Sequence, residues 1–522
     1  MEKEQIRTLE ERDVTEKILG GRRKTVIIAY QKVFNMTLMY LMVPFSIFIL
    51  TWVKTKIAVP CLLLLGIGIL PCFRGKSNSQ SKVELQKAGM VYLVLVAVFW
   101  CWSAGIGGFF YQSPDHHFRN AVFRDLIYEK WPVIYEEYGT GMVYYLGIWI
   151  VPAFLGKMLL RMGLADESVW TVSNAFLLLW CSLGVVLLII LLCLYFQAGR
   201  ASDIAVLVMI LIGFSGVDIV GEIWNNGLNV HNHIEWWSEY FQFRSNTTSI
   251  FWAYNQAIPG WLMTILLLSE RDMRNYGLIL GSALFYAPFA VVGISLCITV
   301  MIFKAFREQY REGKIREALR DFCSYSNVTA VFAMLPVMLA YYSCNAGCDF
   351  KVRFVWEDYG GFSVKILTTW ICFFLLEAGI YICLVAKSEY RKPLYYATAV
   401  SLMAGSILAV GEMGEVVFRI SATMPALFVL MCFVMKIVLD RKKKQGVKNR
   451  VCAAMIFVTM ALGVVTPVIE YIRAIEAIQE RGTVCAVADD LKTLNSEDAP
   501  ENFIGKNIQE SFFYRYMMPP TR

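Results

Sequence analysis

The chain has 522 residues and only four histidines, which fall in two polar stretches between apolar runs. The first stretch opens with Asp115-His116-His117, and the second holds His231 and His233. A carboxylate beside imidazoles can act as a general base toward a hydroxyl group, or help to bind a divalent metal ion. We therefore expect Asp115 to be catalytic, and Asp115, His116, His231 and His233 to be candidate ligands of a divalent metal. The alternatives are an ordinary solvated loop, or an aspartate that caps the following helix.

Arginines near a membrane surface pair bidentately with phosphate groups. Arg119 and Arg124 lie on a short amphipathic helix that we expect after His117, and Arg419 lies at the start of a late apolar run. A charge at such a position is costly, and a phosphate partner would offset the cost. We expect His116, His117 and the three arginines to bind an anionic substrate. Anchoring to lipid headgroups, or snorkelling to the interface, is the alternative for each arginine.

The second polar stretch, from Ser215 to Trp261, mixes acidic and amide side chains with many aromatic rings. Aromatic rings can stack on the apolar faces of sugars, while carboxylates and amides can bind sugar hydroxyl groups. An aromatic belt at the membrane interface is the alternative reading. The density of carboxylates favours a substrate site, for which the candidate binding residues are Asp218, Glu222, Glu235, Arg244 and Gln256.

The composition indicates the elements that must position these residues. Hydrophobic residues make up 57% of the chain, charged residues make up only 17%, and the mean hydropathy is +0.51. The apolar residues arrive in blocks close to the ~20 residues that cross a bilayer as a helix. The net charge of +7 comes from basic clusters in short loops, which is the bias of cytoplasmic loops and does not indicate nucleic acid. We predict an all-α polytopic integral membrane protein.

Counting apolar runs divides the chain into three parts. Residues 1–33 form a charged cytoplasmic leader, 34–470 form the multi-span domain, and 471–522 form a short extracytoplasmic tail. We expect about 13 or more transmembrane helices. The loops 109–140, 219–249 and 343–361 then lie outside the cytoplasm.

The side of loop 219–249 depends on two long apolar runs, 169–196 and 276–303. If each run is a single span, the loop lies inside. If each is a tight pair of short helices, broken at Ser182-Leu183-Gly184 and near Pro288, the loop lies outside. Arginines in the neighbouring connections favour the paired arrangement. We therefore predict that both runs are split.

Several blocks together resemble the GT-C superfamily, which comprises polytopic glycosyltransferases that use polyprenyl-phosphate-linked sugars. The likeness is to bacterial relatives of the protein mannosyltransferases and lipid A aminoarabinose transferases, and it extends over residues 88–440. It rests on DHHFRNAVFRDLIYEKWPV, VYYLGIWIVPAFLGK, SGVDIVGE with HIEWWSEYFQFRSNTTSIFWAYNQAIPGW, and FRISATMPALFVL, which occur in this order. The acid of the family's first loop falls on Asp115, although His116 stands where a second acid is usual. The family's late arginine falls on Arg419.

The resemblance implies a membrane glycosyltransferase with an extracytoplasmic active site in the cell membrane. It would transfer a sugar, with inversion at the anomeric carbon, from a polyprenyl-phosphate donor to a glycan, lipid or protein acceptor. Asp115 would take the acceptor's proton while arginines hold the departing phosphate. A transporter or flippase of a lipid-linked saccharide is the main alternative. A polysaccharide polymerase or ligase and a non-catalytic scaffold are the others.

Overall fold

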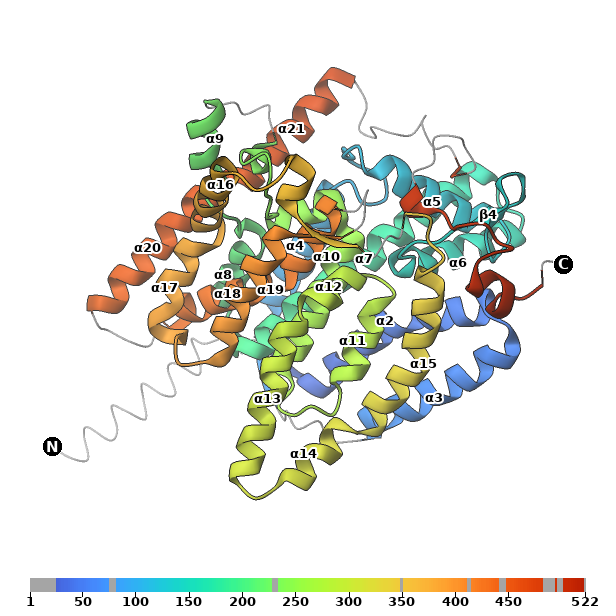
Figure 1. Ribbon diagram of the computed structural model, residues 1–522, viewed down its shortest axis with the longest axis horizontal. Helices are drawn as coiled ribbons and strands as arrows, with labels where there is room; N and C mark the ends of the chain where they lie inside the picture. The colour runs from blue at the N-terminus through green and yellow to red at the C-terminus, as the bar shows by residue number, and fades with distance from the viewer. Residues whose placement is uncertain are drawn as a thin grey trace, which may run out of the picture.

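The computed structural model describes residues 25–74, 81–227, 233–347, 351–410, 415–440, 447–481, 493–494 and 501–520. These residues are almost entirely α-helical (Figure 1). The first helices are α2 (Tyr30–Trp52), α3 (Thr55–Arg74), α4 (Lys87–Ser103), α5 (His116–Tyr128), α6 (Gly147–Arg161), α7 (Asp166–Phe196), α8 (Ala201–Gly213), α9 (Asp218–Asn226), α10 (Asn246–Ser269) and α11 (Tyr276–Leu284). The later helices are α12 (Pro288–Gly293), α13 (Ser295–Arg311), α14 (Ile315–Phe322), α15 (Tyr325–Tyr342), α16 (Val364–Phe374), α17 (Ile380–Glu389), α18 (Pro393–Ile407), α19 (Glu415–Asp440), α20 (Val447–Gly463) and α21 (Val465–Arg481).

The described strands form three small antiparallel pairs at the ends of helices. They are β1 (Thr25–Ala29) with β2 (Lys82–Gln86), β3 (Ile134–Tyr135) with β4 (Thr140–Gly141), and β5 (Val352–Phe354) with β6 (Leu408–Val410). A π-helical turn, Leu375–Gly379, joins α16 to α17. Residues 1–24 of the expected leader lie outside the described residues, and the first helix begins at Tyr30 rather than near residue 34.

Within the described ranges, eight helical stretches are long and apolar enough to cross a membrane. They are Tyr30–Trp52, Thr55–Phe73, Asp166–Phe196, Ala201–Asn226, Ile315–Tyr342, Val364–Glu389, Phe418–Asp440 and Val451–Glu480. This is compatible with a multi-pass membrane protein. The expected count of about 13 or more is not confirmed, because several apolar runs of the described residues fold into shorter helices such as α4 and α6.

The prediction for run 169–196 is wrong, because α7 continues unbroken from Asp166 to Phe196. Gly184 lies inside α7 and allows close packing, since a Cβ atom there would come within 2.6 Å of Tyr40 and Ile258. The prediction for run 276–303 is confirmed. Here α11 ends at Leu284 and α12 begins at Pro288, which occupies the first turn, where a missing N–H group has no cost.

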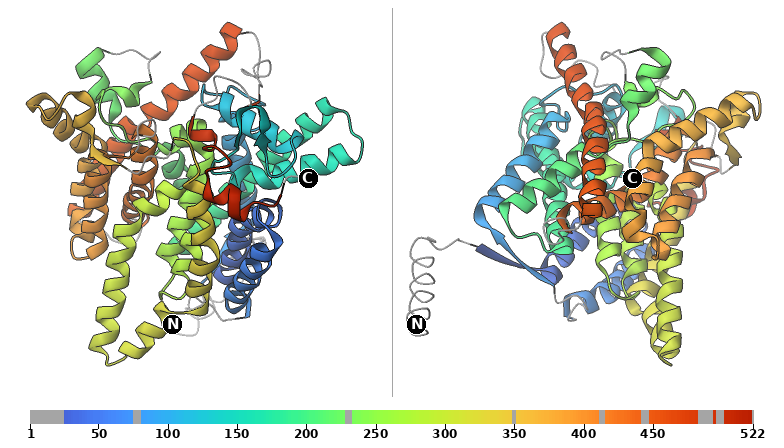
Figure 2. Two further views of the ribbon diagram at one scale, coloured as in Figure 1. Left: turned by 45° about the vertical axis from the view of Figure 1, so that its right-hand side comes forward. Right: turned by 90° about the vertical axis from the view of Figure 1, so that its left-hand side faces the viewer.

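The helix ends lie on two opposite faces of the bundle (Figure 2). On one, which we call the α14 face, Tyr30 contacts Glu270, Cys72 contacts Asn275, and Gln86 contacts Gly199. On the other, which we call the α5 face, the loops after α4, α8, α15 and α18 come together with α21. Contacts on that face include Ser113 with Phe251, and Arg419 with Tyr240.

The two long polar loops share the α5 face for a reason that the sequence did not reveal. Helix α6 does not carry the chain to the α14 face. Its Lys157 bonds the carbonyl of Ile127 at the end of α5, and Tyr128 bonds the carbonyl of Asp166 at the start of α7. Only α7 and α8 therefore separate the two loops, and two crossings return the chain to the same face.

The expected tail is not an isolated segment. Its first residues continue α21, and the strand-like segment at Ile504 pairs with Met142 beside the first loop. Phe513 and Tyr514 are buried, with the Phe513 ring packed against Phe48 and Tyr341. The C-terminal aromatic cluster therefore closes the α5 face over the ends of α2 and α15.

Candidate functional site

The start of α5 is fixed by contacts with α4 and α10. The turn after α4 needs a positive φ at Gly105, where a Cβ atom would collide with the carbonyl of Tyr111. Gln112 then bonds the carbonyl of Gly105 and accepts a hydrogen bond from Asn120 of α5. These bonds hold the first turn of α5 against the end of α4.

A kink in α10 receives that first turn. Ala253 has non-helical backbone angles inside α10, which releases the carbonyl of Phe251 from the helical pattern. Ser113 Oγ donates to this carbonyl at 3.0 Å, and His116 Nε2 lies 3.0 Å from it. The loop before α5 and the kink of α10 thus hold each other in place.

Asp115 occupies the N-cap position of α5, but its carboxylate does not cap the helix. Instead, Oδ2 accepts from Arg119 Nη2 at 3.1 Å, and 44% of the side chain remains exposed. The capping alternative is therefore not what the structure shows. Asp115 is a carboxylate that is both oriented by a neighbour and accessible, as a general base must be.

Arg119 is buried, with only 7% of its side chain exposed. Its Nε and Nη1 atoms are enclosed and form no hydrogen bond of normal geometry to a described residue. The hydroxyl group of Tyr144 lies beside this guanidinium and beside the Asn255 amide. Enclosed donors without acceptors are costly, so the free donors of Arg119 are well suited to an anionic ligand.

Arg244, from the second loop, joins the same neighbourhood. Burial lowers its pKa, and the positive charge of Arg119 acts in the same direction, while Asp115, Glu235 and Glu470 oppose the shift. Its Nε atom is enclosed, and no hydrogen bond or ion pair connects Arg244 to another residue in the described ranges. Arg244 is therefore a half-buried cation that has neighbouring carboxylates but no direct partner among the described residues.

The neighbouring carboxylates are already occupied by other donors. Glu235 accepts from the backbone N–H of Ser245 at 2.8 Å and from Gln242 at 3.1 Å. Glu470 accepts from Trp252 Nε1 at 3.1 Å and from Arg473 at 2.8 Å, and it also contacts His233.

The protonation states of His116 and His233 differ. Burial, with a smaller effect of Arg119, lowers the pKa of His116 to about 3, so this ring is neutral at pH 7. Burial would also lower the pKa of His233, but hydrogen bonds to Glu235 and Glu470 outweigh it and raise the pKa to about 9. His233 is therefore a cation at pH 7.

The cluster as a whole carries a surplus of positive charge. Its members come from α5, the second loop and α21. The cations are Arg119, His233, Arg244 and Arg473, and the carboxylates are those of Asp115, Glu235 and Glu470. Four cations face three carboxylates, so one positive charge has no counterion within this set. We call these seven residues the α5-face cluster.

Several other predicted residues lie in different surroundings. Arg124 is about 140° around α5 from Arg119 at ~100° per residue, and its guanidinium lies over the Tyr128 ring. Arg419 is buried and donates to the carbonyl of Tyr240, close to Asp358. His117 packs its ring edge-on against its neighbour Phe118.

The remaining predicted residues are buried in helices. Asp218 accepts from Ser215 and Thr466 and adjoins the carboxyl group of Glu377. Glu222 accepts from Asn226. Gln256 is buried on α10 with an enclosed, unbonded Oε1 atom.

The positions of the predicted metal ligands do not test whether the protein binds a metal ion. No group of three or more His, Cys, Asp or Glu side chains in the described ranges is placed to hold a metal ion. His231 lies outside the described residues. Of the histidines predicted to bind metal, His116 bonds a backbone carbonyl and His233 bonds two glutamates, so both have protein partners.

Sequence reasoning missed Tyr144, Asn255, Glu470 and Arg473. Glu470 and Arg473 stand one helical turn apart directly after an apolar run, and this spacing was the available signal. Tyr144 and Asn255 lie in aromatic and amide-rich stretches that offered no comparable signal.

No family model, no curated protein and no solved structure matches this chain. The GT-C resemblance therefore rests on the quoted sequence blocks alone. The chemistry of the α5-face cluster therefore follows only from its own residues.

Proposed function

We propose that the protein is a membrane glycosyltransferase that uses a polyprenyl-phosphate sugar donor, with its active site at the α5-face cluster. The observation that carries the proposal is the pair of arginines, Arg119 and Arg244, whose enclosed nitrogens lack acceptors beside an accessible carboxylate, Asp115. A phosphate group would occupy the free donors and offset the surplus positive charge.

The proposed reaction is a single displacement. The acceptor's hydroxyl oxygen attacks the anomeric carbon as the bond from that carbon to the phosphate oxygen breaks. Asp115 takes the hydroxyl proton, and the electron pair of the broken bond leaves with polyprenyl phosphate. Arg119 and Arg244 stabilise the charge on the departing phosphate. The configuration at the anomeric carbon is inverted by this route.

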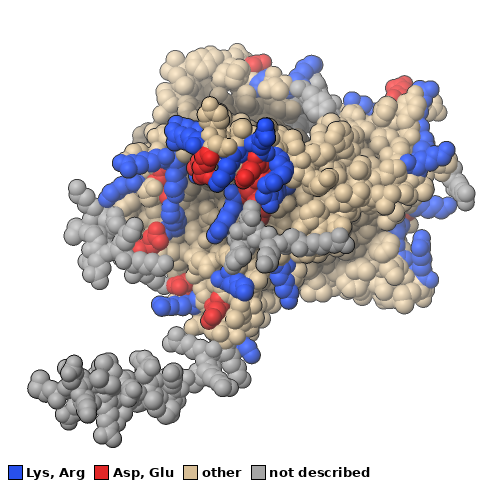
Figure 3. Space-filling model, turned by 90° about the horizontal axis from the view of Figure 1, so that it is seen from below, with Lys and Arg blue, Asp and Glu red and all other residues tan. Residues whose placement is uncertain are grey.

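The charge distribution supports an extracytoplasmic location for this cluster. Lysines and arginines gather on the opposite, α14 face, interspersed with acidic residues (Figure 3). Described basic residues of that face include Arg200, Arg274, Arg311, Lys392 and Lys436. Basic loops are typical of the cytoplasmic side, which would leave the α5 face outside.

The proposal is tested by sugar transfer in membranes that contain the protein, with a series of polyprenyl-phosphate-linked sugars as donors. Asp115→Asn should lower the rate about 10²- to 10⁴-fold, the usual contribution of a general base. Asp166→Asn makes the same chemical change at an exposed acid in the first turn of α7 and should leave transfer intact. Wild-type transfer by Asp115→Asn would exclude the general-base role.

One observation favours a transport function instead. Asp218 and Glu377 form a buried acidic pair within two of the long apolar stretches, close to Glu235. Ionisable groups in such positions are typical of transport pathways. Flux of a lipid-linked saccharide across proteoliposomes, without donor consumption, would support a flippase. Donor consumption that depends on an acceptor would support the transferase.

A further inference from the structure

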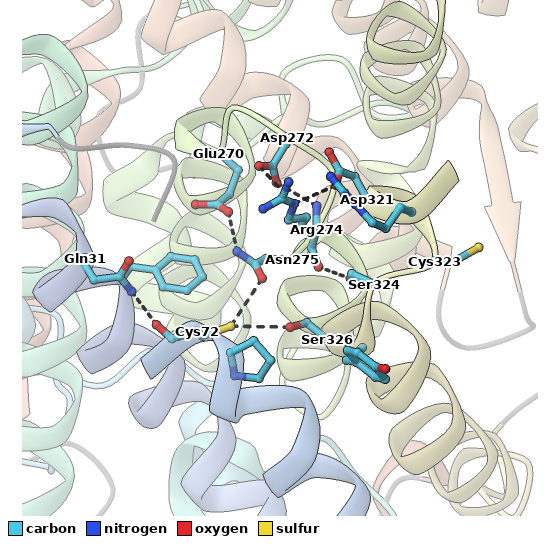
Figure 4. Close-up of a pocket in the computed structure, with 14 residues that line it drawn as sticks. Gln31, Cys72, Glu270, Asp272, Arg274, Asn275, Asp321, Cys323, Ser324 and Ser326 are labelled. Atoms are coloured by element: carbon cyan, nitrogen blue, oxygen red, sulfur yellow. Dashed lines mark hydrogen bonds and ion pairs between the residues drawn. The ribbon is translucent and has the colours of Figure 1, made fainter. Parts of the chain in front are cut away.

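A ligand-sized cavity lies on the α14 face, opposite the α5-face cluster. Its volume is about 530 Å³, within the usual range for small-molecule sites. It is formed by the first turns of α2, the end of α3, the connection from α10 to α11, and the connection from α14 to α15 (Figure 4). Segments far apart in the sequence therefore meet at this cavity.

One wall of the cavity is acidic and held in a defined geometry. Glu270 accepts from Tyr30 at 2.8 Å and from Asn275 at 2.6 Å, so its two oxygens are fixed in position. Asp272 and Asp321 flank Arg274, whose Nε lies 2.8 Å from Asp321 and 3.8 Å from Asp272. Each carboxylate can accept further hydrogen bonds, because an ionised carboxylate has about four acceptor sites.

Two guanidinium groups provide the opposite charge. Arg274 and Arg320 both approach Asp321, the latter at 3.9 Å, and their side chains are 47% and 70% exposed. Each guanidinium has five N–H donors, and the recorded ion pairs of both residues are made through Nε. Their remaining donors can therefore bind a phosphate group.

The charges of the lining select against a purely anionic ligand. Three carboxylates, those of Glu270, Asp272 and Asp321, exceed the two arginines by one negative charge. An anion would add to that excess. A ligand with both a phosphate and an ammonium group places a negative charge at the arginines and a positive charge at the carboxylates, without changing the net charge.

The position of the cavity indicates where such a ligand comes from. Tyr325 lines the cavity and is 75% exposed. It begins an exposed apolar stripe on α15, which continues through Val328 and Phe332. Exposed Leu70 and Phe73 of α3 flank Cys72 of the same lining. Both helices belong to stretches apolar enough to cross a membrane, so these exposed apolar surfaces are suited to contact lipid acyl chains.

We infer that this cavity binds the headgroup of an aminophospholipid, with its phosphodiester at Arg274 and Arg320 and its primary ammonium group at Glu270 and Asp272. Basic pockets between spanning helices on the cytoplasmic side bind anionic headgroups, whereas the acidic wall of this one adds recognition of an amine. The inference goes beyond the proposed function and does not depend on it.

The test is retention of lipid by the full-length protein in detergent, measured by native mass spectrometry. The lipids are phosphatidylethanolamine, its mono- and dimethyl derivatives, phosphatidylcholine and phosphatidylglycerol. We expect retention to fall at least fivefold from phosphatidylethanolamine to phosphatidylcholine, whose trimethylated ammonium cannot donate hydrogen bonds. Equal retention of phosphatidylethanolamine and phosphatidylcholine, or preferred retention of phosphatidylglycerol, would overturn the inference.

Variants test the two halves of the site. Glu270→Gln should abolish the preference for phosphatidylethanolamine, and Arg320→Gln should weaken retention of all headgroups. Lys304→Gln on α13 is the control, since it removes an exposed cation that pairs only at 3.7 Å with Glu308. Wild-type retention by Arg320→Gln would exclude the phosphate contact. If Glu270→Gln fails to fold, the methylation series on the wild type still decides whether the amine is recognised.

A soluble ligand is distinguished in a second arm. Glycerophosphoethanolamine carries the same phosphodiester and ammonium groups without acyl chains. It should raise the Tm of delipidated protein far less than phosphatidylethanolamine at equal concentration. An equal or larger rise would show that the cavity serves a soluble ligand and would overturn the assignment to a lipid.

Discussion

Replacing Arg244 with methionine distinguishes a ligand-binding arginine from a structural one, because the two roles predict different changes in stability. Arg244 has no hydrogen bond or ion pair to a residue in the described part of the chain, and Arg119 repels it. Methionine keeps much of the side-chain length and removes the charge. We expect the Tm in detergent to stay the same or rise, since no direct bond is lost and the cost of burying the charge, which is the largest effect on Arg244, is removed together with the attraction of Asp115, Glu235 and Glu470.

Donor binding should change in the opposite direction. At ~4 Å and an effective dielectric constant of about 20, a guanidinium and a phosphate attract by roughly 4 kcal/mol, which is an upper bound. Hydrogen bonds to charged groups contribute about 1.5–3 kcal/mol net. At about 1.4 kcal/mol per factor of ten, removal of Arg244 should weaken donor binding about 10- to 150-fold.

The assay measures KM for the polyprenyl-phosphate donor and the Tm of the same preparation. Arg124→Met is the matched control, because Arg124 lies on the far side of α5 from Arg119 and should change neither quantity. Arg119→Met should weaken donor binding as well, but its ion pair with Asp115 makes its effect on Tm harder to separate. A lower Tm with an unchanged KM in Arg244→Met would refute the reasoning and make Arg244 a structural counterion.

Three further predictions concern stability, each measured as Tm in detergent. Gly184→Ala should lower Tm by the equivalent of about 1–3 kcal/mol because its Cβ would press on Tyr40, whereas Gly66→Ala, with nothing within 4 Å, should not. His233 has a raised pKa of about 9, so its positive charge stabilises the folded protein fully below about pH 6.5, and this stabilisation is lost as pH rises through 9. The His233→Gln variant should therefore lack this fall in Tm between about pH 6.5 and 9. Burial raises the pKa of Asp125 to about 6, so its contribution favours folding at low pH and is lost between about pH 4 and 6. The Asp125→Asn variant should lose this pH dependence of Tm and still fold, because its amide oxygen can accept from Tyr135 and Leu494, which both donate to Oδ2 in the wild type. An unchanged pH dependence in the variant would show that other groups cause it.

The sequence predicted the class of the protein because composition and the length of apolar runs are local properties. It predicted the break near Pro288, since a proline lacks the N–H group that a continuous helix needs. It failed at Gly184, because a glycine that ends a helix and one that admits a neighbouring helix look alike in sequence. The contact with Tyr40 that distinguishes them joins two distant parts of the chain.

For the candidate site, the sequence predicted individual residues but not their arrangement. Asp115, Arg119 and Arg244 could be named because charged residues next to apolar runs are conspicuous. Their relation to one another could not be derived. Arg119 and Arg124 were equivalent candidates in sequence, and only the contacts of α5 made one buried and left the other over the Tyr128 ring.

The sequence by itself determined that this is a helical chain with enough apolar segments for a multi-pass membrane protein, with polar residues concentrated in a few loops. Only the tertiary structure decided which loops meet. Helix α6 turns back beside the end of α5, so two crossings, by α7 and α8, bring the second loop to the first. The surplus positive charge of the α5-face cluster arises from that meeting, because its charges come from segments far apart in the chain and each segment alone is unremarkable. Charge balance at a site is a property of distances between atoms, which a sequence does not contain.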